Sequence, residues 1–190
     1  MKFKQLIKYS FAFLIIITIT TCSQKSELAL AFKCSNTKIE SDLKYIDDIH
    51  KNYRISYPKH WKSSLYFDEY QSDIYLADTT KSLTSTYILN ISQKKGNIEF
   101  NDDLKEKIYL NSQNQQLEIL AYNQFNFINS PAIYVHSKGF RNNFSYQQIN
   151  ILKPTINSFF YIKIELYGDE TIDNRLCEAI HYINLLQELK

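Results

Sequence analysis

The chain has 190 residues, with 22 Lys and Arg against 20 Asp and Glu, so its formal net charge is only +2. This balance gives no electrostatic reason to expect binding to nucleic acid. The 15 tyrosines and 12 phenylalanines favour strands, and the scarcity of glycine and proline, three of each, excludes collagen-like and low-complexity proteins. The length is sufficient for one domain with a hydrophobic core.

The first 22 residues have the arrangement of a bacterial secretory signal. Three lysines form a basic head, and an apolar run from about Phe11 to Ile19 follows. The run is too short to cross a bilayer, which requires roughly 20 apolar residues. We therefore interpret residues 1–21 as a cleaved signal peptide. The sequence places the protein in the bacterial cell envelope, facing the periplasm or the cell surface.

The cysteine that ends this stretch predicts how the protein is attached. Ile19-Thr20-Thr21-Cys22 resembles the lipobox of bacterial lipoproteins, in which cleavage directly before the cysteine leaves an acylated N-terminus. The family usually has Gly, Ala or Ser where this chain has Thr21. We expect Cys22 to be lipidated and to hold the protein on a membrane, since two acyl chains anchor a protein durably. The alternatives are cleavage after Ala29-Leu30-Ala31, and a plain signal peptide with an ordinary Cys22.

The remaining cysteines are Cys34 and Cys177. Two cysteines in an oxidising compartment suggest one disulfide, which would tie the N-terminal segment to the last helix. The alternative is a pair of buried free thiols, because cysteine packs well as a small apolar side chain. Residues 22–48 are interpreted as a lipidated N-terminus and tether, with a short apolar element at Leu28–Phe32 that could dock on the domain.

Residues 49–190 are predicted to form the folded domain, beginning with a group of strands and a helix. Alternating side chains and turn residues predict strands near residues 53–57, 64–67, 73–77 and 85–92. Asn101 and the acids after it predict the start of a helix that extends to about Gln115. Trp61 follows the end of the first strand, and we expect it to be a core residue.

The second half is predicted to contain four more strands and a terminal helix. The strands are expected near residues 117–127, 132–138, 144–152 and 158–167. Turns are expected at Asn129-Ser130-Pro131 and at Gly139 with Asn142-Asn143. Asp169 and Glu170 are expected to open the helix, whose apolar residues recur at helical spacing. This order indicates an α+β fold with a mostly antiparallel sheet flanked by helices.

Several short motifs resemble the PsbP-like superfamily. The segment Tyr53-Arg-Ile-Ser-Tyr-Pro-Lys-His-Trp61 resembles its opening strand, Ile88-Leu89-Asn90-Ile91 its central strand, and Asn129-Ser130-Pro131-Ala132 a turn whose usual glycine is missing here. The superfamily includes the photosystem II extrinsic subunit, a Ran-binding nuclear import factor and DcrB-like bacterial envelope lipoproteins. The resemblance covers about residues 53–189. It implies an antiparallel sheet with helices on both sides, and it implies no reaction.

The residues point to binding and not to catalysis. The sequence has no glycine-rich phosphate loop, no histidine with a partner at metal-ligand spacing and no G-x-S-x-G motif. No cofactor is expected. The leading interpretation is a non-catalytic, lipid-anchored envelope protein that binds another protein. An inhibitor or immunity-type lipoprotein that acts on an envelope enzyme, and an enzyme of unrecognised type, are the alternatives.

Two groups of side chains are candidates for a binding surface. One is the mixed aromatic and charged face of the last strand, which suits a protein partner if no helix covers it; its residues are Tyr161, Lys163, Glu165 and Tyr167. The other is a set of aromatic side chains near the first strand, which would line a ligand groove or, as we expect, pack as core. These are Tyr57, His60, Trp61, Tyr66 and Phe67.

Overall fold

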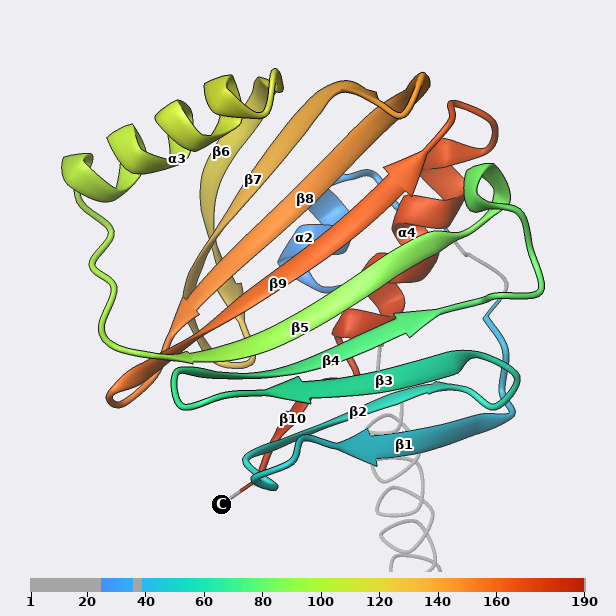
Figure 1. Ribbon diagram of the computed structural model, residues 1–190, viewed down its shortest axis with the longest axis horizontal. Coiled ribbons are helices and arrows are strands. Elements are labelled where there is room, and N and C mark those ends of the chain that lie inside the picture. Colours follow the sequence, from blue (N-terminus) through green and yellow to red (C-terminus); the bar gives the residue numbers. More distant parts are fainter. Residues whose placement is uncertain (1–24, 36–38, 190) are drawn as a thin grey trace, which may run out of the picture.

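Two antiparallel β-sheets form most of the structure, a computed structural model that describes residues 25–35 and 39–189 (Figure 1). The large sheet has seven strands in the order β3-β4-β5-β9-β8-β7-β6, and the small sheet has three in the order β1-β2-β10. With its helices this is the α+β fold that the sequence predicts. The predicted signal peptide and Cys22 lie outside the described residues.

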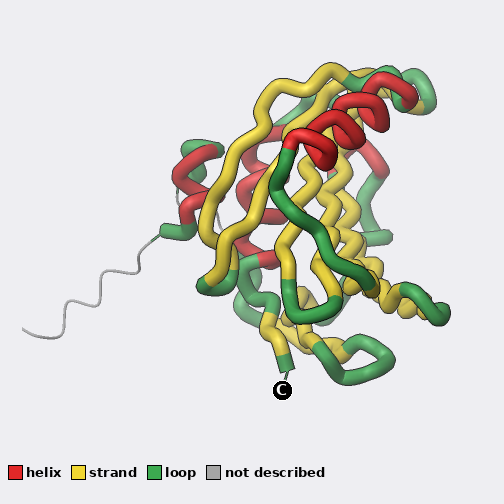
Figure 2. The backbone as a smooth tube through the Cα atoms, turned by 90° about the vertical axis from the view of Figure 1, so that its left-hand side faces the viewer, coloured by secondary structure: helices red, strands yellow, loops and turns green. Residues whose placement is uncertain are grey.

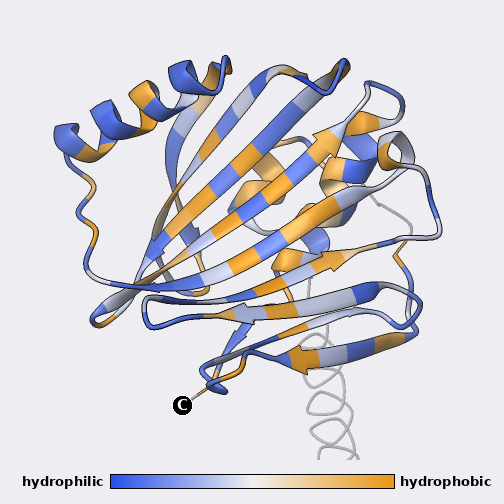
Figure 3. Ribbon diagram, viewed as in Figure 1, coloured by the Kyte–Doolittle hydropathy of each residue, from blue (hydrophilic) through white to orange (hydrophobic). Residues whose placement is uncertain are grey.

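Each strand of the large sheet corresponds to one that the alternation of side chains in the sequence predicts. Its strands are Lys62–Phe67 (β3), Gln71–Ala77 (β4), Tyr87–Lys95 (β5), Glu118–Phe127 (β6), Ser130–Arg141 (β7), Phe144–Pro154 (β8) and Ser158–Tyr167 (β9). Strand β9 pairs with β5 on one side and with β8 on the other, so the two halves of the chain meet at the centre of the sheet. Alternating apolar and polar residues are visible along these strands in Figure 3.

The small sheet includes two strands that the sequence analysis does not predict. Its strands are Leu43–Asp47 (β1), Tyr53–Pro58 (β2) and Gln187–Glu188 (β10). Both β1 and β10 pair with the predicted strand β2. Strand β1 lies within the segment interpreted as a tether, so that interpretation is corrected for these residues. The side chains of β1 show no regular alternation of burial, which explains why its sequence carries no strand pattern.

Helices lie on both sides of the large sheet, as Figure 2 shows. They are Glu27–Ala31 (α2), Asp102–Asn114 (α3) and Ile172–Ile183 (α4), with a short 3-10 helix at Leu83–Ser85 (η2). Helix α4 covers one face of the sheet, where Leu176, Ala179 and Ile180 join the main core with the inward-facing residues of β9. Helix α3 lies beside β6 at the other side (Figure 1).

Helices α3 and α4 begin differently. Helix α3 has the predicted cap, because the Asn101 side chain accepts a hydrogen bond from the backbone N–H of Leu104 (3.0 Å). Helix α4 does not begin at Asp169 as predicted. Asp169 accepts a hydrogen bond from the Ser145 hydroxyl (2.7 Å) instead, and the helix starts only after Thr171, whose φ is 51°. The predicted start is therefore two to three residues too early.

The β6–β7 and β7–β8 hairpins turn at residue pairs that contain asparagine. Ile128-Asn129 and Asn142-Asn143 have positive φ values of 48°, 57°, 52° and 66°, as two-residue hairpin turns require. Ser130 and Pro131 already belong to β7, and Gly139 lies inside that strand, which corrects the turns predicted at these residues. A side chain at Gly139 would meet the backbone oxygen of Gln116 at 2.7 Å, so close packing explains this glycine.

The N-terminal helix is fixed to the domain at three points. Leu28 is completely buried in the main core. The Glu27 carboxylate accepts hydrogen bonds from the backbone N–H and the side-chain amide of Asn126, at 2.7 and 2.8 Å. Cys34 forms a disulfide with Cys177 of α4, with the two Cα atoms 5.4 Å apart. The apolar element expected to dock at Leu28–Phe32 therefore does so.

Candidate functional site

The first candidate surface lies on the face of the large sheet opposite α4. We call this the open face and define it by Asn90, Asn150 and Lys163, which stand on the neighbouring strands β5, β8 and β9. In the part of the chain that the structure describes, no helix crosses the front of these three strands (Figure 1). The predicted surface residues Tyr161, Lys163 and Glu165 all belong to this face.

Lys163 occupies the centre of the open face. It is directly opposite Asn90 on one side and Asn150 on the other in the strand register. Its side chain is half-buried and makes no hydrogen bond or ion pair with any described residue. The two asparagines are largely buried, at 7% and 8% exposed.

Two hydroxyl groups fix the orientation of the Asn90 and Asn150 amides on this face. Ser92 donates a hydrogen bond to the Asn90 side-chain oxygen (3.2 Å), and Tyr161 donates to that of Asn150 (2.9 Å). The amide nitrogens carry the donors of these side chains. The buried Nδ2 of Asn90 has no hydrogen-bond partner among the residues that the structure describes.

The other predicted residues of this surface have structural roles. Glu165 accepts hydrogen bonds from Arg141 (2.9 Å) and from the Tyr146 hydroxyl (2.6 Å), so its charge is neutralised. Tyr167 is buried against Tyr146, with ring centroids 5.0 Å apart. The expectation that Tyr167 is part of an accessible surface is therefore corrected. Burial, with the nearby charge of Glu165, raises the pKa of Tyr161 to about 12, so its hydroxyl stays a donor at neutral pH.

The second candidate surface is a cleft at one end of the large sheet, with a volume of about 710 Å³. Five segments that are distant in sequence form its walls: the β3–β4 hairpin, the β1–β2 turn, the end of β5, the β8–β9 turn and the C-terminal residues. A chain of polar contacts crosses it, from Asn52 to Gln93 (2.9 Å) and from Gln93 to Ser158 (3.3 Å).

Large apolar side chains around this cleft are exposed to solvent. Phe67 is 55% exposed, Tyr70 67% and Ile156 91%. The hairpin that carries the first two is ordered by Asp68, which accepts hydrogen bonds from the backbone N–H groups of Tyr70 (2.7 Å) and Gln71 (2.9 Å). Exposed aromatic side chains around a concavity are typical of protein-binding surfaces.

The aromatic cluster predicted near the first strand is divided between core and surface. Tyr57 and Trp61 are buried, and the Trp61 ring contacts those of Tyr87 and Tyr182 at 5.2 and 5.4 Å. The core prediction is confirmed for these two residues. Tyr66 and Phe67 are exposed at the hairpin, which the sequence analysis did not expect. The reason is that β3 is an edge strand on which all six residues are exposed.

A group of ionisable side chains surrounds His60. Its two ring nitrogens lie 3.2 Å from the Glu40 carboxylate and 3.3 Å from that of Asp78, which Lys81 also approaches at 3.2 Å. Burial of Asp78 opposes its ionisation, but hydrogen bonds from Thr80, with Lys81 and His60, outweigh this effect and lower its pKa to about 2. The group therefore forms an electrostatic link between the end of β4 and the segment before β1.

Two kinds of feature are absent from the described ranges. No helix within them is long and apolar enough to cross a membrane. Within residues 25–35 and 39–189, no group of three or more His, Cys, Asp or Glu side chains could hold a metal ion.

Comparison with known proteins identifies the fold. No protein-family profile matches the chain, and neither does any curated protein sequence. A solved structure from Bacteroides thetaiotaomicron has a TM-score of 0.53 and 15% identity, covering 78% of this chain and 49% of that one. This chain thus spans about half the length of the Bacteroides protein.

Two further solved structures match this chain over almost their whole lengths. The PsbP protein CyanoP from the cyanobacterium Synechocystis has a TM-score of 0.52 and 10% identity, covering 82% of this chain and 97% of its own. A variant of the protein Mog1 has a TM-score of 0.50 and 7% identity, with coverages of 78% and 96%. At these identities the similarity concerns the fold alone. The chain therefore has a PsbP-like fold.

Proposed function

We propose that this chain is a non-catalytic, lipid-anchored protein of the bacterial cell envelope that binds a protein partner at the cleft. The observation that carries the proposal is the exposure of Phe67, Tyr70 and Ile156 around a cleft of about 710 Å³. Large exposed apolar side chains are costly to leave in water, and their burial by a partner is favourable. The charges at the cleft are mixed, with Lys94 and Lys95 beside Asp68 and Glu69.

The position of the N-terminal helix supports an anchor at Cys22. Cleavage at the rival site after Ala31 would remove α2 and with it the fully buried Leu28, whereas cleavage before Cys22 leaves the helix intact. Only two residues separate Cys22 from Lys25, the first described residue, and such a segment spans about 10 Å when extended. A lipid at Cys22 would therefore hold the α2 side close to the membrane.

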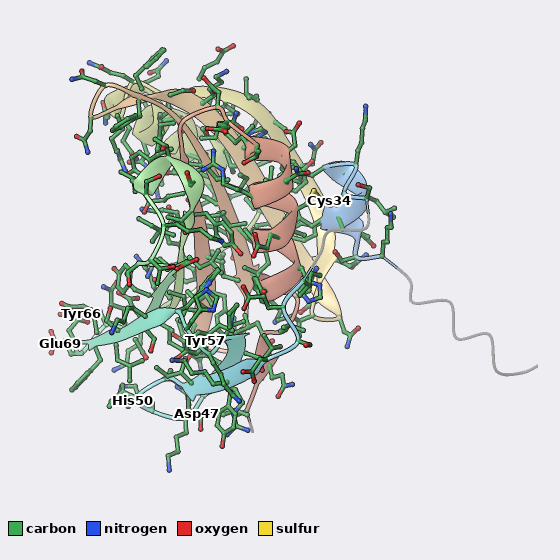
Figure 4. All side chains as sticks on the ribbon, turned by 90° about the vertical axis from the view of Figure 1, so that its right-hand side faces the viewer. Cys34, Asp47, His50, Tyr57, Tyr66 and Glu69 are labelled. Carbon is green, nitrogen blue, oxygen red and sulfur yellow. A yellow bond between two sulfur atoms is a disulfide. The ribbon has the colours of Figure 1, made fainter. Side chains whose placement is uncertain are left out.

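The cleft would then face away from the membrane. In Figure 4 the labelled residues His50, Tyr66 and Glu69 lie on the side of the molecule opposite Cys34. A partner in the aqueous space could reach the cleft without contact with the lipid. Together with the lipobox, this arrangement favours the DcrB-like envelope lipoproteins as the relatives of this chain within the PsbP-like superfamily.

Partner binding is tested by cross-linking in intact envelopes followed by capture of the protein. Phe67→Ser and Tyr70→Ser should each weaken partner capture about thirtyfold, as loss of a central aromatic contact does. Phe140→Ser is the matched control, because Phe140 is also a strongly exposed aromatic residue but lies outside the cleft. Equal capture by all three variants would contradict the proposed site.

The anchor is tested separately. Cys22→Ala should move the protein from the membrane fraction to the soluble fraction, and intact-mass analysis of the wild type should show an acylated N-terminus at Cys22. A mature N-terminus at Phe32 would refute the proposed anchor.

An inhibitor of an envelope enzyme is the second candidate function. The observation that favours it is the ordered, charged β3–β4 turn at Asp68–Gln71, which lies on the side opposite α2. Such a loop could enter the active site of a target enzyme. Loss of inhibition by Glu69→Ala, with capture of a single enzyme, would distinguish this function from a purely structural one.

A further inference from the structure

We propose that Lys163, Asn90 and Asn150 form a binding site for the carboxylate group of a small molecule on the open face. This site is independent of the cleft and of the partner proposed there. It lies at the centre of the large sheet, where β5, β9 and β8 run side by side (Figure 1).

The three side chains present donors to one place. Lys163 is directly opposite both asparagines in the register, so the β-carbons of each pair are about 5 Å apart. The Lys163 ammonium has only donors. The amide nitrogens of both asparagines are donors too, and the hydroxyl groups bound to the amide oxygens fix the orientation of the two amides. The arrangement therefore offers three donors and matches the acceptor oxygens of an anion.

Two observations show that these donors lack partners within the protein. Nδ2 of Asn90 is buried and has no hydrogen-bond partner among the described residues. Lys163 likewise has neither a hydrogen bond nor an ion pair with any residue in the described ranges. Buried polar groups are rarely left unpaired in native proteins. A bound oxyanion would give the buried Asn90 amide its missing partner and the half-buried Lys163 ammonium a counter-ion.

The charge of the site favours a monoanion. Lys163 contributes one positive charge, and no acidic side chain in residues 25–35 or 39–189 forms an ion pair with it. The nearest acid along the strand, Glu165, is already paired with Arg141 at 2.9 Å. A carboxylate brings one negative charge and compensates Lys163, whereas a phosphate dianion would leave a negative charge uncompensated. We therefore assign a carboxylate and not a phosphate.

The experiment is a titration of the purified protein with sodium acetate at neutral pH, followed by NMR of the asparagine side-chain amides. Sodium chloride keeps the ionic strength constant. Acetate should produce saturable shifts of the Asn90 and Asn150 amide signals, with a millimolar Kd because acetate makes few contacts. Lys163→Gln should weaken binding at least about tenfold, since a charge-assisted hydrogen bond is lost.

The matched control is Lys138→Gln, since Lys138 is an exposed lysine of β7 that lies outside the open face. It should change the Kd less than about twofold, as expected for a surface charge at a distance. A second variant, Asn150→Asp, keeps an acceptor for the Tyr161 hydroxyl but replaces the donor with a negative charge, and it should also abolish binding. Circular dichroism confirms the folding of each variant.

The proposal is overturned by shifts that do not saturate, by unchanged acetate binding in Lys163→Gln, or by an equal loss in Lys138→Gln. Tighter binding of inorganic phosphate than of acetate would overturn the assignment to a carboxylate. Because none of these measurements involves the cleft, failure here leaves the proposed partner site unaffected.

Discussion

Removal of the disulfide between Cys34 and Cys177 should cause a large loss of stability. The two cysteines are separated by 143 residues, and for a loop of this length the chain-entropy treatment gives about 5 kcal/mol. Native disulfides of small exported domains typically contribute 2–5 kcal/mol. The double variant Cys34→Ala/Cys177→Ala should therefore lower the free energy of unfolding by about 3–5 kcal/mol, chiefly because its unfolded chain is less constrained.

Urea denaturation of the wild type and the double variant measures this difference. The m-value of the variant should rise, since an unfolded chain without the cross-link exposes more surface. Wild-type protein reduced with dithiothreitol is the control, and its unfolding curve should coincide with that of the variant. A loss below about 1 kcal/mol, or a reduced wild type that keeps its full stability, would refute the reasoning from loop closure.

Three further predictions concern packing and pH. Trp61→Ala should lower the free energy of unfolding by about 3–5 kcal/mol, because the ring is only 2% exposed; a loss under about 1 kcal/mol in urea denaturation would contradict its core role. Gly139→Ala should lower the free energy of unfolding by about 1–3 kcal/mol, because the new methyl group would lie 2.7 Å from the Gln116 oxygen. An unchanged midpoint of urea denaturation would show that the backbone moves to accommodate the methyl group. Because its folded-state pKa of about 2 lies below the ordinary value of 3.8, Asp78 contributes stability that is lost as the pH falls through this interval. The free energy of unfolding of Asp78→Asn should therefore fall less over that pH range than that of the wild type. Parallel plots of the free energy of unfolding against pH for the two proteins would contradict this.

The sequence predicts the large sheet well because its signal is local. The side chains of strand β9 point alternately to the core under α4 and to the open face. Its buried residues are apolar, and its polar residues are more exposed. Helix α3 is similarly predicted by its cap at Asn101. Strands β1 and β10 lack such a pattern because their side chains are mostly half-buried or exposed, and they exist through pairing with β2. Pairing of this kind is a tertiary property that the local sequence does not carry.

The candidate sites are predicted only in part for the same reason. The alternation of β9 identifies Lys163 and Tyr161 as neighbours on one face, and the structure places them so. It cannot show that Tyr146 packs against Tyr167, because Tyr146 belongs to another strand. The cleft combines Asn52 and Ile156, which are about a hundred residues apart. Phe67 and Tyr66 look like core residues in sequence, and only the edge position of β3 exposes them.

The covalent link between Cys34, which follows α2, and Cys177 of α4 determines how the molecule responds to mechanical load. A pulling force applied at Lys25 passes through residues 26–34 and then through the Cys34–Cys177 bond into α4. That helix is packed across the middle of the large sheet, so the force is shared by many core contacts at once. The force first loads α2, including the hydrogen bonds between Glu27 and Asn126, whether or not the bond is present. The bond stops this detachment at Cys34, and beyond that point the core around α4 must yield.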